Sequence, residues 1–509
     1  MMKLWFFKNP IRHYSSKTTQ KWRSVVGLEV HAQIISKSKL FSPSSSAFSS
    51  PVNSNVSFLD ASLPGTLPVL NKRCVEAGVM TALALNCDVN LVSMFDRKHY
   101  FYGDMPAGYQ ITQQRSPLAQ YGNLHFFVYT PGVHKSPYSK EVRIKQLQLE
   151  QDSGKSLHDS DRSLIDLNRA GMGLMELVFE PDLTDGEEAA ALVKELIAIL
   201  KRIGTCSCKM EEGALRVDAN VSIHREKEPL GVRTEIKNIG SVRGVASAIK
   251  YEINRQIEMK ERGYDIINET RSWDAISKST LPLRDKEEKQ DYRYMPEPNL
   301  PPLYLSFGNL IPGLVNVKSL KEIQPELPAQ IRIRLSKELG LTENQALLLV
   351  NDDVLLELFE ETLKIKSLKP TLLANIIIYE FSKIITDFDK KPQEMTHWIM
   401  FLADSVHLLD TRQISRNTVR YLFEVLSKGC NKDALQIVHE QNLFQITDLE
   451  ELRKLCEEVI KENETLVNTY KAGKKKVFKA LMGKIALKTQ DRADMAKCDE
   501  IMKNLLNKL

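Results

Sequence analysis

The stretch VVGLEVHAQ, residues 25–33, alternates aliphatic and polar side chains, and it sets the fold expected for the first part of the chain. With a period of two residues, one face of the predicted strand is aliphatic, and Glu29, His31 and Gln33 lie on the other face. Residues i and i+2 of a strand are about 6.5–7 Å apart, so Glu29 and His31 could reach the same small ion or polar substrate. A half-exposed strand without any site is the commoner origin of such a pattern, so the neighbouring sequences must decide.

Two later stretches repeat this alternation and extend the predicted sheet. At residues 215–223, Arg216 and Asp218 share the polar face. At residues 231–238, the polar face carries Arg233, Glu235 and Lys237. The predicted fold class is therefore α+β: a mainly antiparallel sheet with a charged face and helices against its other side, followed by an all-helical domain and a helical C-terminal tail domain.

Two carboxylates indicate that the charged face is a cleft rather than a solvated surface. Glu176 lies in the apolar run GLMELVF, where a carboxylate without a nearby cation would be expensive to bury. Glu150 ends an alternating stretch and is followed directly by the turn sequence QDSG. Oxygen ligands with one imidazole suit Mg²⁺, particularly when phosphate supplies further ligands. The chain has no P-loop and no glycine-rich kinase loop, so a nucleotide site would lie outside the common motifs.

Composition narrows the class of protein. The 509 residues suffice for two to four domains, and a net charge of +5 means that any nucleic-acid role requires a local basic patch. The 7 cysteines form no CxxC pair, which favours a reducing compartment and argues against structural zinc. No apolar run reaches about 18 residues, so no membrane span is predicted.

Residues 1–23 are predicted to be a mitochondrial transit peptide. The segment combines Lys and Arg with Ser and Thr, and the first acidic residue of the chain is Glu29. A disordered basic tail on a cytosolic protein is the alternative.

Eight motifs occur in order along the chain and carry a family resemblance. They are GLEVHAQ (27–33), LPGTLPVLN (63–71), FDRKHYFYGDMPAGYQITQ (95–113), LEQDSGKS (149–156), DLNRAGMGLMELVFEPD (166–182), KMEEGALRVDANVS (209–222), RTEIKNIGSV (233–242) and DYRYMPEPNLPPL (291–303). Together they closely resemble the B-subunit family of the glutamyl-tRNA(Gln) amidotransferases, in its mitochondrial form. The resemblance runs from about residue 24 to the C-terminus and is dense up to residue 303.

The resemblance implies a division of labour within a complex. The family's glutaminase A subunit passes ammonia to the B subunit, and a small C subunit completes the complex. In this family the B subunit takes up mischarged Glu-tRNA(Gln), phosphorylates the glutamyl γ-carboxylate with ATP, and lets ammonia displace the phosphate. The expected cofactors are ATP and Mg²⁺, and the expected location is the mitochondrial matrix. The chain contains nothing like a glutaminase triad, so it should need its A partner.

The resemblance also assigns the central site. Glu29, His31, Glu150 and Glu176 match the family's metal-binding positions near the transamidation centre, and they are the expected catalytic set. Asp218 and Glu235 match further acidic positions in the same pocket, associated with the nucleotide and its metal.

A second group of residues is expected to hold ATP or the tRNA 3′ end. The polar-aromatic segment at 95–113 supplies Lys98, Tyr100, Tyr102, Asp104, Tyr109 and Gln110. Its aromatic rings could stack on unpaired bases, or could pack as hairpin staples. Candidates for phosphate neutralisation are Arg216, Arg233, Lys237 and Arg293. An internal salt bridge is equally open for each of these four.

Three departures from bacterial relatives concern the ammonia path and zinc. Gln151 stands where many relatives carry a second Glu, and Ala107 stands where many carry Lys. In the family these two charges meet along the ammonia path. We expect neutral polar contacts here instead, because losing both charges leaves neither one unpaired. The segments 41–44 and 59–62 lack the cysteines that some relatives use for zinc, so no zinc is expected.

Beyond residue 307 the sequence becomes leucine-rich and helical. A catalytic cradle domain is predicted at 24–307, a helical domain at 308–411 and a helical tRNA-binding tail domain at 412–509. The tail contains a predicted amphipathic helix with a strongly basic start, suited to the phosphate backbone of tRNA. The lysines expected to contact the tRNA body are Lys474, Lys475, Lys476, Lys479 and Lys484. A solvated charged face is the alternative.

Two other functions fit parts of the sequence. A non-catalytic scaffold for tRNA is disfavoured by the intact set of Glu29, His31, Glu150 and Glu176. A free-standing metal-dependent kinase of a small carboxylic acid is disfavoured by the basic tail. Such an enzyme would show no salt-sensitive tRNA binding.

Overall fold

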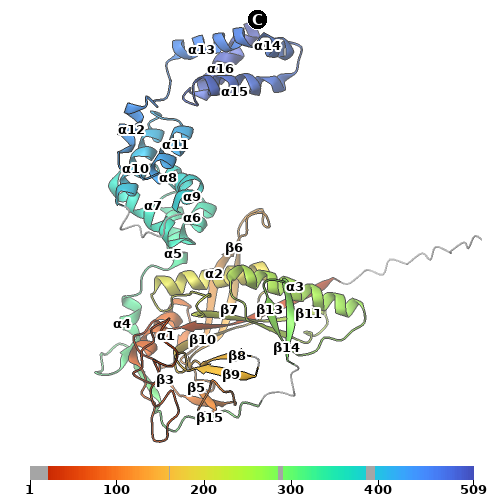
Figure 1. Cartoon of the computed structure of the whole chain (residues 1–509), viewed down its shortest axis with the longest axis vertical. Coiled ribbons are helices and arrows are strands. Elements are labelled where there is room, and N and C mark those ends of the chain that lie inside the picture. Colours follow the sequence, from red (N-terminus) through yellow and green to blue (C-terminus); the bar gives the residue numbers. More distant parts are fainter. Residues whose placement is uncertain (1–20, 160, 285–290, 386–395, 509) are drawn as a thin grey trace, which may run out of the picture. The chain divides into compact units, whose positions relative to one another are not determined.

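The computed structural model describes residues 21–159, 161–284, 291–385 and 396–508. It divides into two compact units, Met1–Pro328 and Ala329–Leu509, and each is described by itself (Figure 1). The predicted transit peptide lies outside the described residues except for its last three. Of these, Trp22 and Arg23 already belong to the first strand.

A nine-stranded sheet forms the framework of the first unit. Its strand order is β14-β13-β12-β11-β1-β10-β7-β6-β2, and its neighbouring strands are antiparallel except for the parallel pair β12 and β13. The strands are β1 Trp22–Gln33, β2 Asp88–Val89, β6 Ala119–Val128, β7 Tyr138–Gln151, β10 Gly173–Phe179, β11 Leu215–Arg225, β12 Thr234–Lys237, β13 Thr270–Asp274 and β14 Ser279–Arg284.

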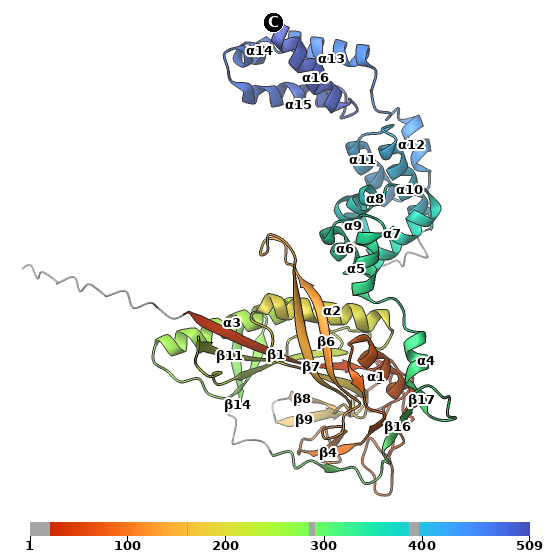
Figure 2. The same ribbon diagram turned by 180° about the vertical axis from the view of Figure 1, so that it is seen from behind.

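The alternation in β1 gives the sheet one apolar face and one polar face. Val26, Leu28 and Val30 are at most 1% exposed and belong to the core of the unit. Helices α2 and α3 lie along this face, as both views show (Figure 1, Figure 2). Glu29 and His31 point to the opposite face, so the predicted separation of polar and apolar side chains is confirmed.

Three small sheets complete the strands of the first unit. Their orders are β15-β4-β5, β17-β16-β3 and β8-β9. Their strands are β3 Val92–Ser93, β4 Asp96–His99, β5 Tyr109–Thr112, β8 Lys155–Asp159, β9 Arg162–Asp166, β15 Met295–Pro296, β16 Leu303–Ser306 and β17 Val315–Asn316. Strand β5 packs against β7, which brings β4 and its residue Lys98 to the polar face of the large sheet.

Four helices of the first unit have local sequence reasons for where they begin. They are α1 Lys72–Ala84, α2 Gly186–Arg202, α3 Val242–Glu261 and α4 Val317–Glu322. Asp185 caps α2 by accepting a hydrogen bond from the backbone N–H of Glu188 at 2.8 Å. Ser241 caps α3 in the same way through the N–H of Gly244 at 3.0 Å.

The second unit is helical. Its α-helices are α5 Pro328–Lys337, α6 Glu343–Val350, α7 Asp353–Ile365, α8 Pro370–Ile376, α9 Ser382–Ile385, α10 Thr396–Asp410, α11 Arg416–Ser427, α12 Ala434–Glu440, α13 Leu449–Glu462, α14 Glu464–Lys471, α15 Phe478–Lys488 and α16 Met495–Lys508. A π-helical turn at Ile377–Phe381 and a 3₁₀ turn at Lys475–Val477 join neighbouring helices. The prediction of an α+β fold with a helical C-terminal region is confirmed.

The buried side chains place the predicted domain boundaries within packed regions. Val315 belongs to the core of the first unit, so this core continues past residue 307. Val419 and Phe423 of α11 belong to a core cluster that extends to Val438, so the boundary predicted at 411 falls inside this cluster. A separate cluster is formed by helices α13 to α16.

Within the described residues, no helix combines the length and the apolar character needed to cross a bilayer. The seven cysteines all lie in the described part of the chain, and they form no disulfide there.

Candidate functional site

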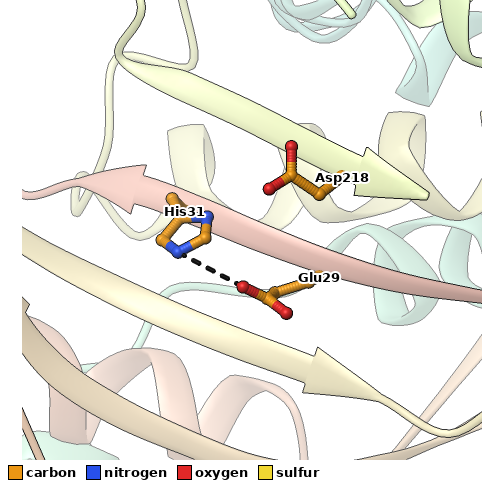
Figure 3. A group of neighbouring side chains, drawn as sticks. All are labelled: Glu29, His31 and Asp218. Carbon is orange, nitrogen blue, oxygen red and sulfur yellow. Dashed lines mark ion pairs between the residues drawn. The ribbon is translucent and has the colours of Figure 1, made fainter. Parts of the chain in front are cut away.

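Strand register gathers the predicted carboxylates around His31. On β1, Glu29 is paired with Asp218 of β11, and His31 is paired with Glu176 of β10 on its other side. The side chains of Glu29, His31 and Asp218 lie close together on the same side of these strands (Figure 3). Residues far apart in the sequence therefore meet on one patch of the polar face.

Two overlapping groups of possible metal ligands share His31. Glu29, His31 and Asp218 form one group, and His31, Glu150 and Glu176 form the other. In each group the three ligand atoms lie within 4.8 Å of one another. His31 Nε2 is 3.5 Å from Glu29 Oε1 and 3.9 Å from Glu176 Oε2. The structure thus brings together the four residues predicted as catalytic, with Asp218 beside them.

Burial shifts the pKa values of these groups in opposite directions. Burial, reinforced by Glu150, raises the pKa of Glu176 well above that of a free carboxyl group. Burial also raises the pKa of Glu29, and Asp218 adds to the shift. Burial, with Arg216 and Lys98 nearby, lowers the pKa of His31 well below its ordinary value. His31 is therefore a neutral imidazole at pH 7, the form that binds metals, among carboxylates whose negative charge a cation would stabilise.

Glu150 has an unsatisfied oxygen that fits such a cation. Its Oε2 atom is buried and accepts no N–H hydrogen bond from the described residues, although the Glu150 and Glu176 side chains lie within hydrogen-bond reach of each other. Lys98 Nζ lies 3.6 Å from this oxygen, beyond hydrogen-bond distance. Burial alone would lower the pKa of Lys98, but Glu150 and Glu176 raise it well above its usual value, so Lys98 is charged. A buried carboxylate oxygen without an N–H donor, beside other carboxylates and an imidazole, belongs to a set of ligand atoms suited to Mg²⁺.

Two predicted phosphate-binding cations are paired with carboxylates in the structure. Lys237 Nζ lies 2.9 Å from Asp218 Oδ2 and 3.5 Å from Glu235 Oε1. Arg216 lies 2.9 Å from Asp152 Oδ2, although its Nε atom is buried without a hydrogen-bond partner among the described residues. Lys237 and Arg216 therefore form the internal salt bridges that the sequence left open for them.

The two other predicted phosphate-binding residues lie apart from these pairs. Arg233 is exposed and precedes β12. Arg293 is also exposed, and its backbone carbonyl accepts a hydrogen bond from His99 Nδ1 at 3.0 Å.

The aromatic segment makes several ring contacts near Lys98. Tyr100 packs edge-on against Tyr102 and Tyr292, with ring centroids 5.5 and 6.0 Å apart. Lys98 Nζ lies 5.3 Å from the centre of the Tyr292 ring. Half-buried Tyr109 carries the Arg97 guanidinium over its ring at 4.2 Å. These contacts match the packing alternative, while Tyr102 remains exposed.

The residues predicted for the ammonia path line a pocket of about 310 Å³. Ala107 and Gln151 lie in its wall together with the carboxylate residues Asp60, Asp104 and Asp152. The Gln151 side-chain oxygen accepts a hydrogen bond from the Ile111 N–H at 3.0 Å. Gln110 is buried and donates to the Gln151 carbonyl at 2.8 Å, so it positions the pocket wall.

The five predicted tRNA-body lysines are exposed. Three of them form the run Lys474–Lys476 at the 3₁₀ turn before α15, and Lys479 and Lys484 lie on α15 itself. Leu481 and Ile485 of the same helix are buried. The helix is therefore amphipathic, with its basic run at the N-terminal end.

Sequence reasoning missed two buried polar residues next to the predicted set. Gln148 is 2% exposed and donates to Glu176 Oε2 at 2.7 Å. Asp152 is 3% exposed and pairs with Arg216. The only sequence signal for Gln148 was its position two residues before Glu150, on the same strand face, and Asp152 lay in a motif typical of a turn.

Comparison with known proteins identifies the family. A family model for the GatB/GatE catalytic domain matches residues 24–309, and one for the GatB domain matches residues 357–506. The B chain of mitochondrial glutamyl-tRNA(Gln) amidotransferase from Aedes aegypti is 51% identical, over 97% of this chain and 96% of that relative. The protein of the same name from Homo sapiens is 48% identical, over 97% of this chain and 91% of that relative.

A bacterial relative extends the same match. The B component of the aspartyl/glutamyl-tRNA(Asn/Gln) amidotransferase from Rickettsia bellii is 42% identical, over 97% of this chain and 99% of that relative. The catalytic-domain model covers more than half of the chain, and these relatives cover nearly all of it. As its ordered motifs predicted, the chain belongs to the B-subunit family of the glutamyl-tRNA(Gln) amidotransferases.

Proposed function

We propose that this chain converts mischarged Glu-tRNA(Gln) to Gln-tRNA(Gln) by an ATP-dependent route. It phosphorylates the glutamyl γ-carboxylate, and ammonia then displaces the phosphate. A carboxylate is a poor acyl electrophile, so the acyl phosphate supplies a leaving group. The observation that carries the proposal is the convergence of Glu29, Asp218, Glu150 and Glu176 on His31.

The residues of the two overlapping groups would hold Mg²⁺. Glu29, His31, Glu150, Glu176 and Asp218 supply the nitrogen and oxygen donors that suit this ion. Glu235 lies one strand further and touches the same network through Lys237. Bound Mg²⁺ would neutralise charge on the phosphoryl group as it is transferred.

The cations of the site would orient the phosphates of ATP. Lys98, Arg216 and Lys237 are each held by a carboxylate, so they are ordered before substrate binds. The buried Arg216 Nε–H has no hydrogen-bond partner among the described residues and is available to an anionic oxygen. Tyr100, Tyr102, Asp104, Tyr109 and Arg293 stay candidates for contact with ATP or with the tRNA 3′ end.

The pocket at Ala107 and Gln151 would form part of the ammonia path. Both residues are uncharged, and the Gln151 side chain is already hydrogen-bonded to the Ile111 backbone. At Ala107 and Gln151, ammonia would therefore meet two uncharged side chains rather than an ion pair.

The exposed lysines of the tail would bind the tRNA body. Lysines at a helix N-terminus lie at the unfavourable end of the helix dipole, so Lys474–Lys476 do not serve helix stability. The same end of the helix favours phosphate. These contacts would supply affinity, and tRNA identity would depend on shape.

The chain would act in a complex in the mitochondrial matrix. Its partners would be the glutaminase A subunit and a small C subunit, giving a heterotrimer, and residues 1–23 would be its transit peptide. No zinc is expected at the segments 41–44 and 59–62. A non-catalytic scaffold within the same complex is the second candidate, and the complete donor set around His31 weighs against it.

Amide transfer by the reconstituted complex tests the proposal. Wild type and Glu150→Ala are assayed on Glu-tRNA(Gln) with glutamine or with free ammonia as nitrogen donor. Loss of Gln-tRNA formation with both donors, while glutaminase activity and tRNA binding persist, places Glu150 in phosphorylation and transfer. Full activity of the variant would contradict the assigned site.

A further inference from the structure

Gln148 connects the two strands that carry Glu150 and Glu176. It lies on β7, two residues before Glu150 and therefore on the same strand face, and it is paired in register with Glu176 of β10. Its Nε2 atom donates to Glu176 Oε2 at 2.7 Å and to Thr112 Oγ1 at 3.1 Å. With only 2% of its surface exposed, the side chain cannot exchange these partners for water without local opening.

A neighbouring amide fixes which end of Gln148 faces the carboxylate. Gln146 Nε2 donates to Gln148 Oε1. The carbonyl end of Gln148 is thereby engaged, and its two N–H groups point to Glu176 and Thr112. The amides of Gln146 and Gln148 form a relay of hydrogen bonds that ends on one oxygen of Glu176.

We propose that Gln148 is a positioning residue, which holds the Glu176 carboxylate in the orientation that binds the metal together with His31 and Glu150. This inference rests on the metal site of the proposed function. One oxygen of Glu150, one oxygen of Glu176 and a ring nitrogen of His31 lie within 4.8 Å of one another, so the direction of each carboxylate decides whether the three residues can share one cation. The Gln148 N–H fixes the direction of the Glu176 oxygen before a cation binds.

A neutral donor suits this position better than a cation would. Lys98, beside Glu150, carries a positive charge that opposes the binding of a second cation. The Gln148 amide orients Glu176 without cancelling its charge, so the attraction for a metal is kept. Precise placement of ligands by a second layer of hydrogen bonds is worth about 10–100-fold in metal affinity.

The test measures metal binding directly, with Mn²⁺ as a paramagnetic substitute for Mg²⁺. The full chain, assembled with its partner subunits, is titrated with Mn²⁺, and free Mn²⁺ is followed by electron paramagnetic resonance. Gln148→Met keeps the length of the side chain and removes the donor. We expect it to weaken Mn²⁺ binding by about tenfold or more and to shift the Mg²⁺ requirement of amide transfer upward by a similar factor. Excess Mg²⁺ should restore the transfer rate.

Gln113 offers a matched control. It is fully buried beside the same strand, donates to Ser93 Oγ and accepts from the Leu149 N–H, both at 3.0 Å. Gln113→Met should lower the thermal unfolding temperature and leave Mn²⁺ affinity unchanged. Equal weakening of Mn²⁺ binding in both variants would overturn the inference, because it would reflect general loosening of β7.

Further outcomes separate this inference from the proposed function. Unchanged Mn²⁺ affinity in Gln148→Met, with binding that is lost in Glu150→Ala, overturns the role of Gln148 and leaves the metal site standing. Wild-type binding that Glu150→Ala does not alter overturns the site and the inference together. If Gln148→Met does not fold, Thr112→Val removes the second partner of the same amide. A smaller loss of Mn²⁺ affinity there supports the role, and no loss contradicts it.

Discussion

His31 Nε2 lies 3.9 Å from Glu176 Oε2, across the paired strands β1 and β10. Burial disfavours charge on both groups, so it lowers the pKa of the imidazole and raises the pKa of the carboxyl group. The two groups therefore do not form the strong ion pair that would stabilise the fold. Their proximity costs stability in the metal-free chain, and a cation shared with Glu150 would recover it.

Replacing Glu176 should separate activity from stability. In Glu176→Gln a buried carboxylate becomes a neutral amide of the same shape. We expect amide transfer to fall by about 100-fold or more, because one charged ligand is lost. The thermal unfolding temperature of the metal-free protein should stay equal or rise, since burial of the charge is relieved.

Glu188 is the control for this change. It is also a buried glutamate, but it pairs with Lys140 at 3.0 Å and accepts from the Thr184 N–H at 2.7 Å. Glu188→Gln should lower the unfolding temperature and leave transfer by the folded protein intact. If Glu176→Gln behaved like Glu188→Gln, Glu176 would be a structural residue.

The shifted pKa values also predict how Mg²⁺ stabilises the chain at different pH. The pKa of Glu176 is near 4.5 in the unfolded chain and is raised in the folded chain. In the pH range between these two pKa values, Glu176 holds its proton more tightly in the folded state. The free energy of unfolding therefore falls as pH rises through this range, and Glu29 contributes with the same sign. The contribution of His31 to the free energy of unfolding has the opposite sign. Below about pH 6.5 His31 gains a proton in the unfolded chain, so its contribution to stability rises with pH and is complete above that pH.

Thermal unfolding with Mg²⁺ or with a chelator, at pH 6 and pH 8, measures the consequence. The metal competes with protons for Glu29 and Glu176, so Mg²⁺ should raise the unfolding temperature more at pH 8. Adding the chelator should remove the rise in unfolding temperature that Mg²⁺ causes at each pH. An equal shift at both pH values would show that these carboxylates do not titrate with the metal.

The sequence predicted which sheet face each site residue lies on better than it predicted which residues pair across the strands. The alternation of β1 and β11 is local, so it was sufficient to place Glu29, His31 and Asp218 on one side of the sheet. The sequence around Glu150 and Glu176 also singled out these two carboxylates, and the family resemblance assigned them to the same site. The pairing of His31 with Glu176 is a matter of register between distant strands, and no local pattern contains it.

Side-chain partners were the least predictable feature. An amide on a strand face is usually solvated, so the position of Gln148 two residues before Glu150 was not enough to predict its bond to Glu176. Asp152 pairs with Arg216, which comes from a strand distant in sequence. Gln110 likewise donates to the carbonyl of Gln151, which is 41 residues away in the sequence. Partners of this kind follow from the assembled fold alone.

A negative charge at Gln151 should impair the glutamine-dependent reaction. Gln151→Glu replaces the amide whose oxygen accepts from Ile111 N–H, and adds a carboxylate to a pocket that already holds Asp60, Asp104 and Asp152. Ammonium would be retained there, and the rate with glutamine should fall more than the rate with saturating free ammonia. Adding Ala107→Lys should restore part of the rate by pairing the new charge. If Gln151→Glu alone left the glutamine-dependent rate unchanged, the neutral path would be contradicted.

Charge removal from the tail should weaken tRNA binding in a salt-dependent way. Lys474, Lys475 and Lys476 are exposed, and Lys474→Ala, Lys475→Ala and Lys476→Ala are combined in one variant. If each lysine neutralises one phosphate, the slope of log K against log salt should become shallower by about 2 to 3. Transfer at saturating tRNA should persist, because the cluster around His31 lies in the other compact unit.

The control removes two lysines that are paired with carboxylates. Lys488 pairs with Glu458, and Lys503 pairs with Asp499. The double variant Lys488→Ala, Lys503→Ala should leave the slope nearly unchanged. An identical slope for wild type and the triple variant would mean that the basic run is a solvated face.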